Sequence, residues 1–367
     1  MTQPEVLSDR ALGRALLARQ LLLHRVARPA LEVVEHLVGL QAQEPEDPYV
    51  ALWSRVAGFD PDELGRALLD RRAVRIALQR STIHLVTARD CLALRPVLGP
   101  AGERLARGQF GRRLAGVDRA ELAAAARELV DQRPMTFGEL GSRLAERWPD
   151  RDPLALAQTS RTLVPLVQLP PRGVWGRSGR ALHVSVESWL GRPVGADTAP
   201  DPLVLRYLAA FGPATVADVQ NWSGLTRLGE VMERLAPRLR TFRAEDGRTL
   251  HDPPDAPRPP ADTPAPVRFL PEYDNVLLGH ANRSRILPRG VRQLWQDPSR
   301  HWSSYLVDGR VRGTWWLERS SAGRAALHLR ALPALSAAEE EDVTREAAAL
   351  LDFLAPAAAG REVRLAR

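Results

Sequence analysis

Two glutamines separated by one alanine, Gln41 and Gln43, lie in the stretch LVGLQAQEPEDPY at 37–49. An apolar helical pattern stops there, and a loop interrupted by prolines begins. A carboxamide is too weakly basic to deprotonate water, but its oxygen accepts hydrogen bonds from water. Two such oxygens that face one space could therefore orient a water molecule for attack.

The residues around the pair predict its backbone conformation. Glu44 precedes a proline and is therefore disfavoured in the helical region, so the helix predicted over 30–40 should end near Gln41. If 41–43 is extended, side chains two apart lie on the same face and Ala42 is turned away. The alternative is that both amides cap the end of the helix or lie in solvent.

The composition is typical of a globular protein. Of 367 residues, 44% are hydrophobic and 26% are charged, and this length favours two to four compact units. No apolar run reaches the ~18 residues that a membrane span needs, and the N-terminal stretch lacks the layout of a secretory signal. We expect a cytoplasmic, nucleoid-associated protein that acts as a monomer.

The basic residues are all arginine. The chain has 51 of them, contains no lysine and carries a formal net charge of +7. Arginine offers a planar fork of donors that suits phosphate, and a net positive protein is favoured on a polyanion. The absence of lysine excludes lysine Schiff bases and P-loop lysines.

Signatures of metal and cofactor sites are missing from the sequence. The single cysteine, Cys91, excludes disulfides within the chain and cysteine-rich metal sites. The eight histidines lack ligand spacing, and the P-loop, the Rossmann glycine pattern, HExxH and GxSxG are all absent. We expect no metal and no cofactor, and we interpret Cys91 and His36 as packed structural residues.

A weak internal repeat organises the first two thirds of the chain. The stretch 119–190 has a helix, a second helix opened by Thr136, a third helical stretch, and two short apolar runs around a glycine-containing turn. The stretch 201–251 repeats that order, with Thr215 in the place of Thr136 and an Asp-Gly turn. Residues 30–86 fit a third copy.

Three helices followed by a hairpin is the plan of a winged helix, a helix-turn-helix with a β-ribbon attached. The alternative is a set of unrelated helical segments. In the first copy, Ser81 and its neighbours should form the hairpin turn. We therefore expect a mainly α protein with β-hairpin wings, an α+β fold. Its expected divisions are winged helix 1 with the N-terminal helices at 1–115, winged helix 2 at 116–195, winged helix 3 at 196–255, a proline-rich linker at 256–266 and a C-terminal α+β unit at 267–367.

The pattern beyond the proline-rich stretch changes to alternating strands. Asp308 and Gly309 predict a hairpin turn between two of them. A long amphipathic helix follows, with Ser336 as its expected N-cap and acidic residues in its first turn.

Four segments in order resemble the AlkZ/YcaQ-type winged-helix DNA glycosylases: LVGLQAQ, DPYVALWSRV, RSTIHLV at 80–86 and LPEYDNVLLGHANRSRIL at 270–287. The Gln-apolar-Gln triplet is similar to the AlkZ-like branch, since the YcaQ-like branch has an aspartate at the position of Gln43. The resemblance implies tandem winged helices in a concave, basic arrangement. It also implies that Gln41 and Gln43 are the catalytic pair. His84, His280 and Arg283 fall in matching segments, and the resemblance does not assign their roles.

The implied activity is hydrolysis of the N-glycosidic bond of N7-alkylated purines, including bulky adducts and interstrand crosslinks, often in cells that make a DNA-alkylating natural product. A purine alkylated at N7 is a cationic, good leaving group, so no strong general acid is required. The paired amides would orient the attacking water beside an oxocarbenium-like sugar. Glu44 or Asp47 could assist; the alternative is that they are solvated or capping residues. Without lysine, the enzyme should be monofunctional and leave an intact abasic site.

The expected partner is double-stranded DNA with alkylated purines. The stretch 71–89 has five arginines and no acid, 103–113 has four arginines and one acid, and 280–289 has three arginines. The predicted DNA-binding residues are Arg75, Arg80, His84, His280, Arg283 and Arg285. Two other hypotheses are a winged-helix transcriptional regulator without enzymatic activity and a DNA-binding scaffold of a repair complex.

Overall fold

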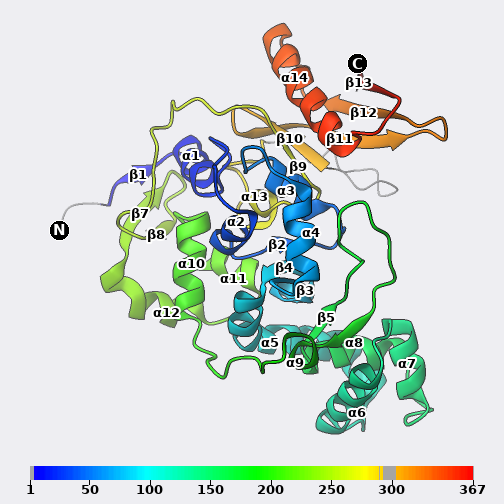
Figure 1. The fold of residues 1–367 in the computed structure, drawn as a ribbon. Helices are drawn as coiled ribbons and strands as arrows, with labels where there is room; N and C mark the ends of the chain where they lie inside the picture. The colour runs from blue at the N-terminus through cyan, green and yellow to red at the C-terminus, as the bar shows by residue number, and fades with distance from the viewer. Residues whose placement is uncertain (1–3, 289, 292–302, 367) are drawn as a thin grey trace.

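The computed structural model describes residues 4–288, 290–291 and 303–366, and it confirms a mixed α+β fold (Figure 1). Arg289, one of the arginines of the 280–289 stretch, lies outside the described residues. The N-terminal part contains β1 (Val6–Leu7), α1 (Asp9–Arg19), α2 (Ala30–His36), β2 (Leu40–Gln41), α3 (Asp47–Trp53), α4 (Pro61–Leu69), β3 (Ala73–Ala77), β4 (Ile83–Thr87) and α5 (Ala88–Phe110).

The remaining elements follow in three groups. The first contains α6 (Arg119–Gln132), α7 (Phe137–Ala145), α8 (Pro153–Leu163), β5 (Leu166–Gln168), β6 (His183–Ser185) and α9 (Val186–Leu190). The second contains α10 (Asp201–Phe211), α11 (Val216–Ser223), α12 (Leu228–Leu235), β7 (Arg240–Ala244) and β8 (Thr249–Asp252). The third contains β9 (Arg268–Leu270), α13 (Asn275–Leu278), β10 (Ser303–Val307), β11 (Arg310–Arg319), β12 (Arg324–Ala331), α14 (Ala337–Leu354) and β13 (Gly360–Ala366).

The same strand pairing recurs in the three repeated segments. In the first, β2 lies between two helices and pairs with β4, the second strand of the hairpin. In the other two, a single residue takes the place of β2: Met135 bridges His183, and Ala214 bridges His251. Because helix order and pairing agree in all three, we keep their division into winged-helix units as a proposal.

The hairpins of the first two segments join into one sheet with the order β2-β4-β3-β5-β6. The contact between them is antiparallel and pairs Arg75 with Gln168 and Ile76 with Val167. Strand β2, which carries Gln41, is therefore an edge strand of a sheet that spans two segments. In Figure 1 this sheet lies between the helices α3 and α4 and the group α6–α8.

The predicted helix caps are confirmed, but one helix end is not. Thr136, Thr215 and Ser336 each begin their helix with a capping box. The helix predicted over 30–40 ends at His36, because the chain then turns through left-handed backbone at Val38 (φ 58°) and Gly39 (φ 93°). A side chain at position 39 would lie 2.7 Å from a methyl group of Val86, so only glycine fits this turn.

The proline-rich segment after β8 has no helix or strand, as predicted, and arginines of α1 hold it in place. Arg10 Nε donates to the carbonyl of Ala261 at 2.7 Å, and Arg19 Nε donates to that of Pro257 at 3.1 Å. Arg19 also forms a buried ion pair with Asp252. These arginines therefore stabilise the fold.

The C-terminal residues form a sheet with the order β13-β12-β11-β10-β9, on which α14 packs. Asp308 (φ 46°) and Gly309 (φ 75°) form the hairpin turn, as predicted. Figure 1 shows this unit at the top, with the C-terminus, while α6 and α7 lie at the opposite end.

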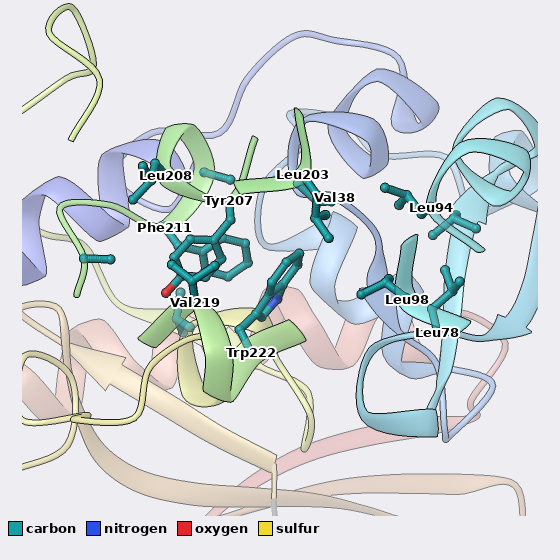
Figure 2. Close-up of a cluster of buried hydrophobic side chains, with 14 of the residues drawn as sticks. Val38, Leu78, Leu94, Leu98, Leu203, Tyr207, Leu208, Phe211, Val219 and Trp222 are labelled. Carbon is teal, nitrogen blue, oxygen red and sulfur yellow. The ribbon is translucent and has the colours of Figure 1, made fainter. Parts of the chain in front are cut away.

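A hydrophobic cluster lies beneath the edge strand β2 and the hairpin β3–β4 (Figure 2). Val38 enters it from the turn before β2, and Leu78 enters it from the end of β3. Trp222 of α11 packs in the same cluster, with its ring centroid 5.0 Å from that of Tyr207. Helix α11 and both turns are therefore fixed relative to one another by one core.

A buried ion pair connects the C-terminal part to α3. Arg55 donates from Nη1 and Nη2 to the two oxygens of Asp274, each at 2.8 Å, and neither side chain is exposed to solvent. Arg55 Nε also donates to the carbonyl of Gln20 at 2.9 Å. This pair holds the segment before α13 against the helix that follows the glutamine pair.

Replacing Asp274 by asparagine should lower the free energy of unfolding by ~3–5 kcal/mol, because it leaves the buried Arg55 guanidinium without its counter-charge. Denaturant titration measures the change. The matched control is Asp70→Asn, which removes an exposed pair with Arg72 at 3.6 Å and should cost at most about 1 kcal/mol. Equal effects of the two substitutions would contradict this account.

Candidate active site

Gln41 lies in the short strand β2, and Gln43 follows two residues later, where the chain bends. Leu40 and Ala42 both belong to the hydrophobic cluster on the other side of the strand, and side chains alternate along extended backbone. Gln41 is 8% exposed, whereas Gln43 is exposed. The pair therefore consists of one buried amide and one amide at the surface.

The backbone of this segment is held from several elements. Asn275 Nδ2 donates to the carbonyl of Gly39 at 3.0 Å, just before β2. Ala42 N donates to the carbonyl of Ile83 at 2.8 Å, and Arg75 Nη2 donates to the carbonyl of Ala42 at 2.8 Å. The peptide groups on both sides of Gln41 are thus fixed by distant parts of the chain.

Each amide oxygen accepts one hydrogen bond within the protein. Arg80 Nη2 donates to Gln41 Oε1 at 3.3 Å, and the backbone N–H of Ile83 donates to Gln43 Oε1 at 3.4 Å. An amide oxygen has two lone pairs, so each oxygen keeps capacity for a water molecule. The two donors also determine that the oxygens, rather than the NH₂ groups, face these neighbours.

His84 lies directly across the strands from Gln41. Its Nδ1 donates to the carbonyl of Thr82 at 2.9 Å. Burial, with the nearby Arg80 guanidinium, lowers the pKa of His84 to about 3, so the imidazole is neutral at physiological pH. It therefore acts as a neutral packing partner of the glutamine, not as a cation for phosphate.

The hairpin turn beside Gln41 is strained. Arg80 (φ 51°) and Ser81 (φ 61°) both adopt left-handed backbone, which costs on the order of 1–3 kcal/mol for each such residue. Two guanidinium groups stabilise the turn: Arg80 Nη1 donates to Trp222 O at 2.6 Å, and Arg161 Nη2 donates to Ser81 O at 2.6 Å. Arg80 is thereby held against the amide of Gln41.

Further arginines gather around this turn. Burial, and then the positive charge of Arg283, lowers the pKa of Arg80. The exposed Arg104 of α5 donates to the carbonyl of Gly224 at 3.1 Å, and Gly224 itself lies against the backbone of Arg80. Arg80 therefore contacts the inner glutamine, and Arg104 is bonded to a residue that packs against Arg80.

Four predicted DNA-binding residues lie in the interior. Arg75, His84, His280 and Arg285 are 1%, 4%, 1% and 3% exposed. His280 Nε2 bonds to the carbonyl of Phe211 at 3.1 Å, and Arg285 Nη1 donates to that of Pro213 at 2.9 Å. Their burial argues against direct phosphate contacts, which corrects the expectation for these four; Arg80 and Arg283 remain at the candidate site.

A buried carboxyl group lies a few residues beyond the pair. Asp47 is 9% exposed, and burial, together with the charges of Glu272 and Glu44, raises its pKa to about 8. The backbone N–H of Tyr273 bonds to the carboxyl group, while Oδ2 has no hydrogen-bond partner. Asp47 is therefore neither solvated nor a simple cap, and no pattern in the sequence indicates that Glu272 approaches it.

Asp47 and Glu44 line a cavity of about 860 Å³. Its other walls come from 172–179, from Glu272 and from the C-terminal sheet, including Trp315. Glu44, the residue after Gln43, is part of the cavity lining. No feature of the sequence predicted this cavity.

Within the described residues, no group of three or more His, Cys, Asp or Glu side chains has a geometry that could hold a metal ion. Among the helices that the structure describes, none combines the length and the apolar character needed to cross a membrane.

Comparisons with known proteins agree on one family. The family described as DNA glycosylase AlkZ-like matches residues 34–353. A protein named "Interstrand DNA cross-link repair glycosylase" from Streptomyces sahachiroi is 25% identical over 324 residues, which cover 81% of this chain and 84% of that protein. The solved structure of Streptomyces sahachiroi DNA glycosylase AlkZ has a TM-score of 0.79 at 21% identity and covers 98% of this chain and 100% of that one.

Replacing Asp47 by asparagine should flatten the pH dependence of stability. Between the ordinary pKa of 3.8 and about 8, the folded protein keeps a proton that the unfolded chain releases, so the free energy of unfolding falls as the pH rises. The variant lacks this loss and should be more stable than the wild type at about pH 8.5, by ~1–3 kcal/mol after discounting for relaxation of a buried charge.

Denaturant titrations at about pH 5 and about pH 8.5 measure this difference. The control is Asp62→Asn, which removes an exposed acid from the first turn of α4. Parallel pH profiles for wild type and Asp47→Asn would contradict the assignment of a protonated carboxyl group.

Proposed function

The chain belongs to the AlkZ-like DNA glycosylase family, and we propose that it hydrolyses the N-glycosidic bond of N7-alkylated purines in double-stranded DNA. The observation that carries the proposal is the placement of two carboxamide oxygens, those of Gln41 and Gln43, against one neighbouring segment, 80–83, from which each accepts a hydrogen bond. The inner oxygen lies beside a guanidinium group, and the outer one lies at the surface, where a substrate can reach it.

In the proposed mechanism, the lesion supplies most of the driving force. A purine alkylated at N7 is positively charged and leaves as a neutral base, so its departure needs no strong acid. Charge then develops on the deoxyribose, and the negative ends of the two amide dipoles stabilise it while they hold the attacking water. The rate gain comes from position rather than from basicity, which favours lesions that are already destabilised.

The glutamines and the arginines have separate roles. Arg80 contacts the inner glutamine, and we propose that Arg80 and Arg283 bind the phosphates that flank the target nucleotide. Positive charge at the sugar would oppose the oxocarbenium ion, so in this mechanism the amide oxygens, and not the guanidinium groups, face the sugar. The arginines therefore position the DNA, and the amides act on the sugar.

The substrate range includes bulky adducts and interstrand crosslinks. The relative from Streptomyces sahachiroi is named as a cross-link repair glycosylase, which supports this extension and a role in DNA repair. We propose self-resistance to a genotoxic natural product as a further role. The chain contains no lysine, so an amine-dependent lyase step is not expected and the product is an intact abasic site. We propose that the enzyme acts as a monomer in the cytoplasm, on the nucleoid.

Gln41→Ala and Gln43→Ala should each lower the rate of base excision at least about tenfold, a loss of ~1.4 kcal/mol of transition-state stabilisation, with little change in DNA affinity. Single-turnover release of N7-methylguanine from a defined duplex measures the rate, and a crosslinked duplex assayed beside it tests the wider range. Gln132→Ala, at the exposed end of α6, is the control.

Wild-type activity in the double variant would remove the mechanism. If no base is released from any alkylated duplex and one DNA sequence is strongly preferred, the chain is a transcriptional regulator. Binding of lesions without turnover would instead indicate a scaffold.

Arg283→Ala should weaken binding to all duplexes alike and reduce the salt dependence of the affinity by about one unit, because one phosphate contact is lost. Fluorescence anisotropy over a range of salt concentrations measures the slope. Arg345→Ala, on the exposed face of α14, should leave the slope unchanged. An unchanged slope for Arg283→Ala would exclude this residue from the DNA interface.

A further inference from the structure

The turn that carries Arg80 is a meeting point of the three repeated segments. It belongs to the first segment and joins β3 to β4. The second segment reaches it through Arg161, in the last turn of α8. The third reaches it at the end of α11, where Trp222 O accepts a hydrogen bond from Arg80 and Gly224 packs beside the Arg80 backbone. All three segments therefore contact the turn whose arginine bonds to Gln41.

The backbone of this turn is unfavourable on its own. Arg80 and Ser81 are consecutive residues with left-handed φ angles of 51° and 61°, and neither is the glycine that such positions favour. Within the turn, Ser81 N donates to Leu78 O at 3.0 Å, and Thr82 N donates to Gln79 O at 3.1 Å. Strained residues persist only where the surrounding structure holds them. Contacts from outside the turn are therefore needed to keep its shape.

Arg161 supplies such a contact from the second segment. Its Nη2 donates to the carbonyl oxygen of Ser81 at 2.6 Å and to the hydroxyl oxygen of the same residue at 3.1 Å. A charged donor makes a stronger hydrogen bond than a neutral one. The side chain is half-buried, and the end of α8 is fixed in turn, because β5 follows it directly and pairs with β3. Arg161 therefore holds Ser81 from a rigid support.

The orientation of the Gln41 amide depends on this turn. A carboxamide can rotate by half a turn and exchange the positions of its oxygen and its NH₂ group. Arg80 Nη2 lies 3.3 Å from Gln41 Oε1 and donates to it. The opposite orientation would place two donors against each other, since a guanidinium group accepts no hydrogen bond. If the turn relaxed, Arg80 would move away from the amide and this preference would be lost.

We propose that Arg161 is a positioning residue for base excision. It holds the backbone of Ser81, the turn holds Arg80, and Arg80 orients the inner amide oxygen toward the attacking water. This inference rests on the proposed glycosylase function and adds to it a residue from outside the segment that carries the glutamines. Arg161 acts through the turn and not on the substrate. The proposal applies equally to a crosslinked base, because it does not require the target nucleotide to leave the duplex.

Arg161→Ala should lower the single-turnover rate of N7-methylguanine release at least about tenfold, a loss of ~1.4 kcal/mol of transition-state stabilisation. Fluorescence anisotropy should show an unchanged affinity for the same duplex and an unchanged salt dependence. Arg161→Gln, which fills part of the same space but ends short of Ser81, should give the same loss if the alanine variant does not fold. The control is Arg127→Ala, which removes a half-buried ion pair with Glu187 in the same segment and should excise as the wild type does.

A second background separates positioning from a general loss of stability. Glycine adopts left-handed backbone without strain, so in Ser81→Gly the turn needs less support from Arg161. Adding Arg161→Ala to Ser81→Gly should therefore lower the rate at most about threefold relative to Ser81→Gly itself, because the two residues act on the same turn and their effects are not additive. A general structural defect would lower the rate by the same factor in both backgrounds.

The outcomes separate this inference from the function on which it rests. Wild-type excision by the Arg161 variants, an equal loss of rate in both backgrounds, or a matching fall in DNA affinity would overturn the positioning role. In each of these cases the wild type still releases N7-methylguanine, so the proposed function stands. If the wild type releases no base from any alkylated duplex, the function fails and the positioning role fails with it.

Discussion

The candidate site depends on the short segment 39–43, whose backbone is held in place by hydrogen bonds from distant parts of the chain. Hydrogen bonds from Asn275, from Arg75 and to Ile83 fix the peptide groups around Gln41. With the backbone fixed, both carboxamide oxygens lie against the segment 80–83 and accept hydrogen bonds from it. A fixed backbone matters more here than in most hydrolases. An amide does not act as an acid or a base near neutral pH, so its contribution to catalysis depends on the position of its oxygen.

Arginine has two kinds of role in this lysine-free chain. Arg19 and Arg55 form fully buried ion pairs with Asp252 and Asp274, which attach the proline-rich and C-terminal segments to the N-terminal helices. A second group surrounds the strained turn at Arg80 and remains accessible at its edge. A net charge of +7 therefore does not by itself define a DNA-binding surface, because some of the arginines are buried and stabilise the interior.

Much of the fold could be predicted from the sequence, since helix caps and Asp-Gly turns are local signals. The prediction that 41–43 is extended holds for Gln41, which lies in β2, but the chain bends at Gln43. The end of the first helix was misplaced because the left-handed turn at Val38 depends on tertiary contacts. The burial of His280 and Arg285 could not be predicted from the sequence either. Guanidinium and imidazole groups are buried only where carbonyl groups of distant segments accept hydrogen bonds from them. The cavity needs three segments far apart in the chain, so no local pattern could indicate it.

The most direct measurement is a structure of the protein bound to a duplex in which the target nucleotide carries a cationic pyrrolidine in place of deoxyribose, a mimic of the oxocarbenium ion. This account predicts a water molecule that donates hydrogen bonds to Oε1 of both Gln41 and Gln43 and lies against the anomeric position. If the two amides bind the DNA backbone instead, or if no water lies between them and the sugar mimic, positioning of water by the glutamine pair is wrong.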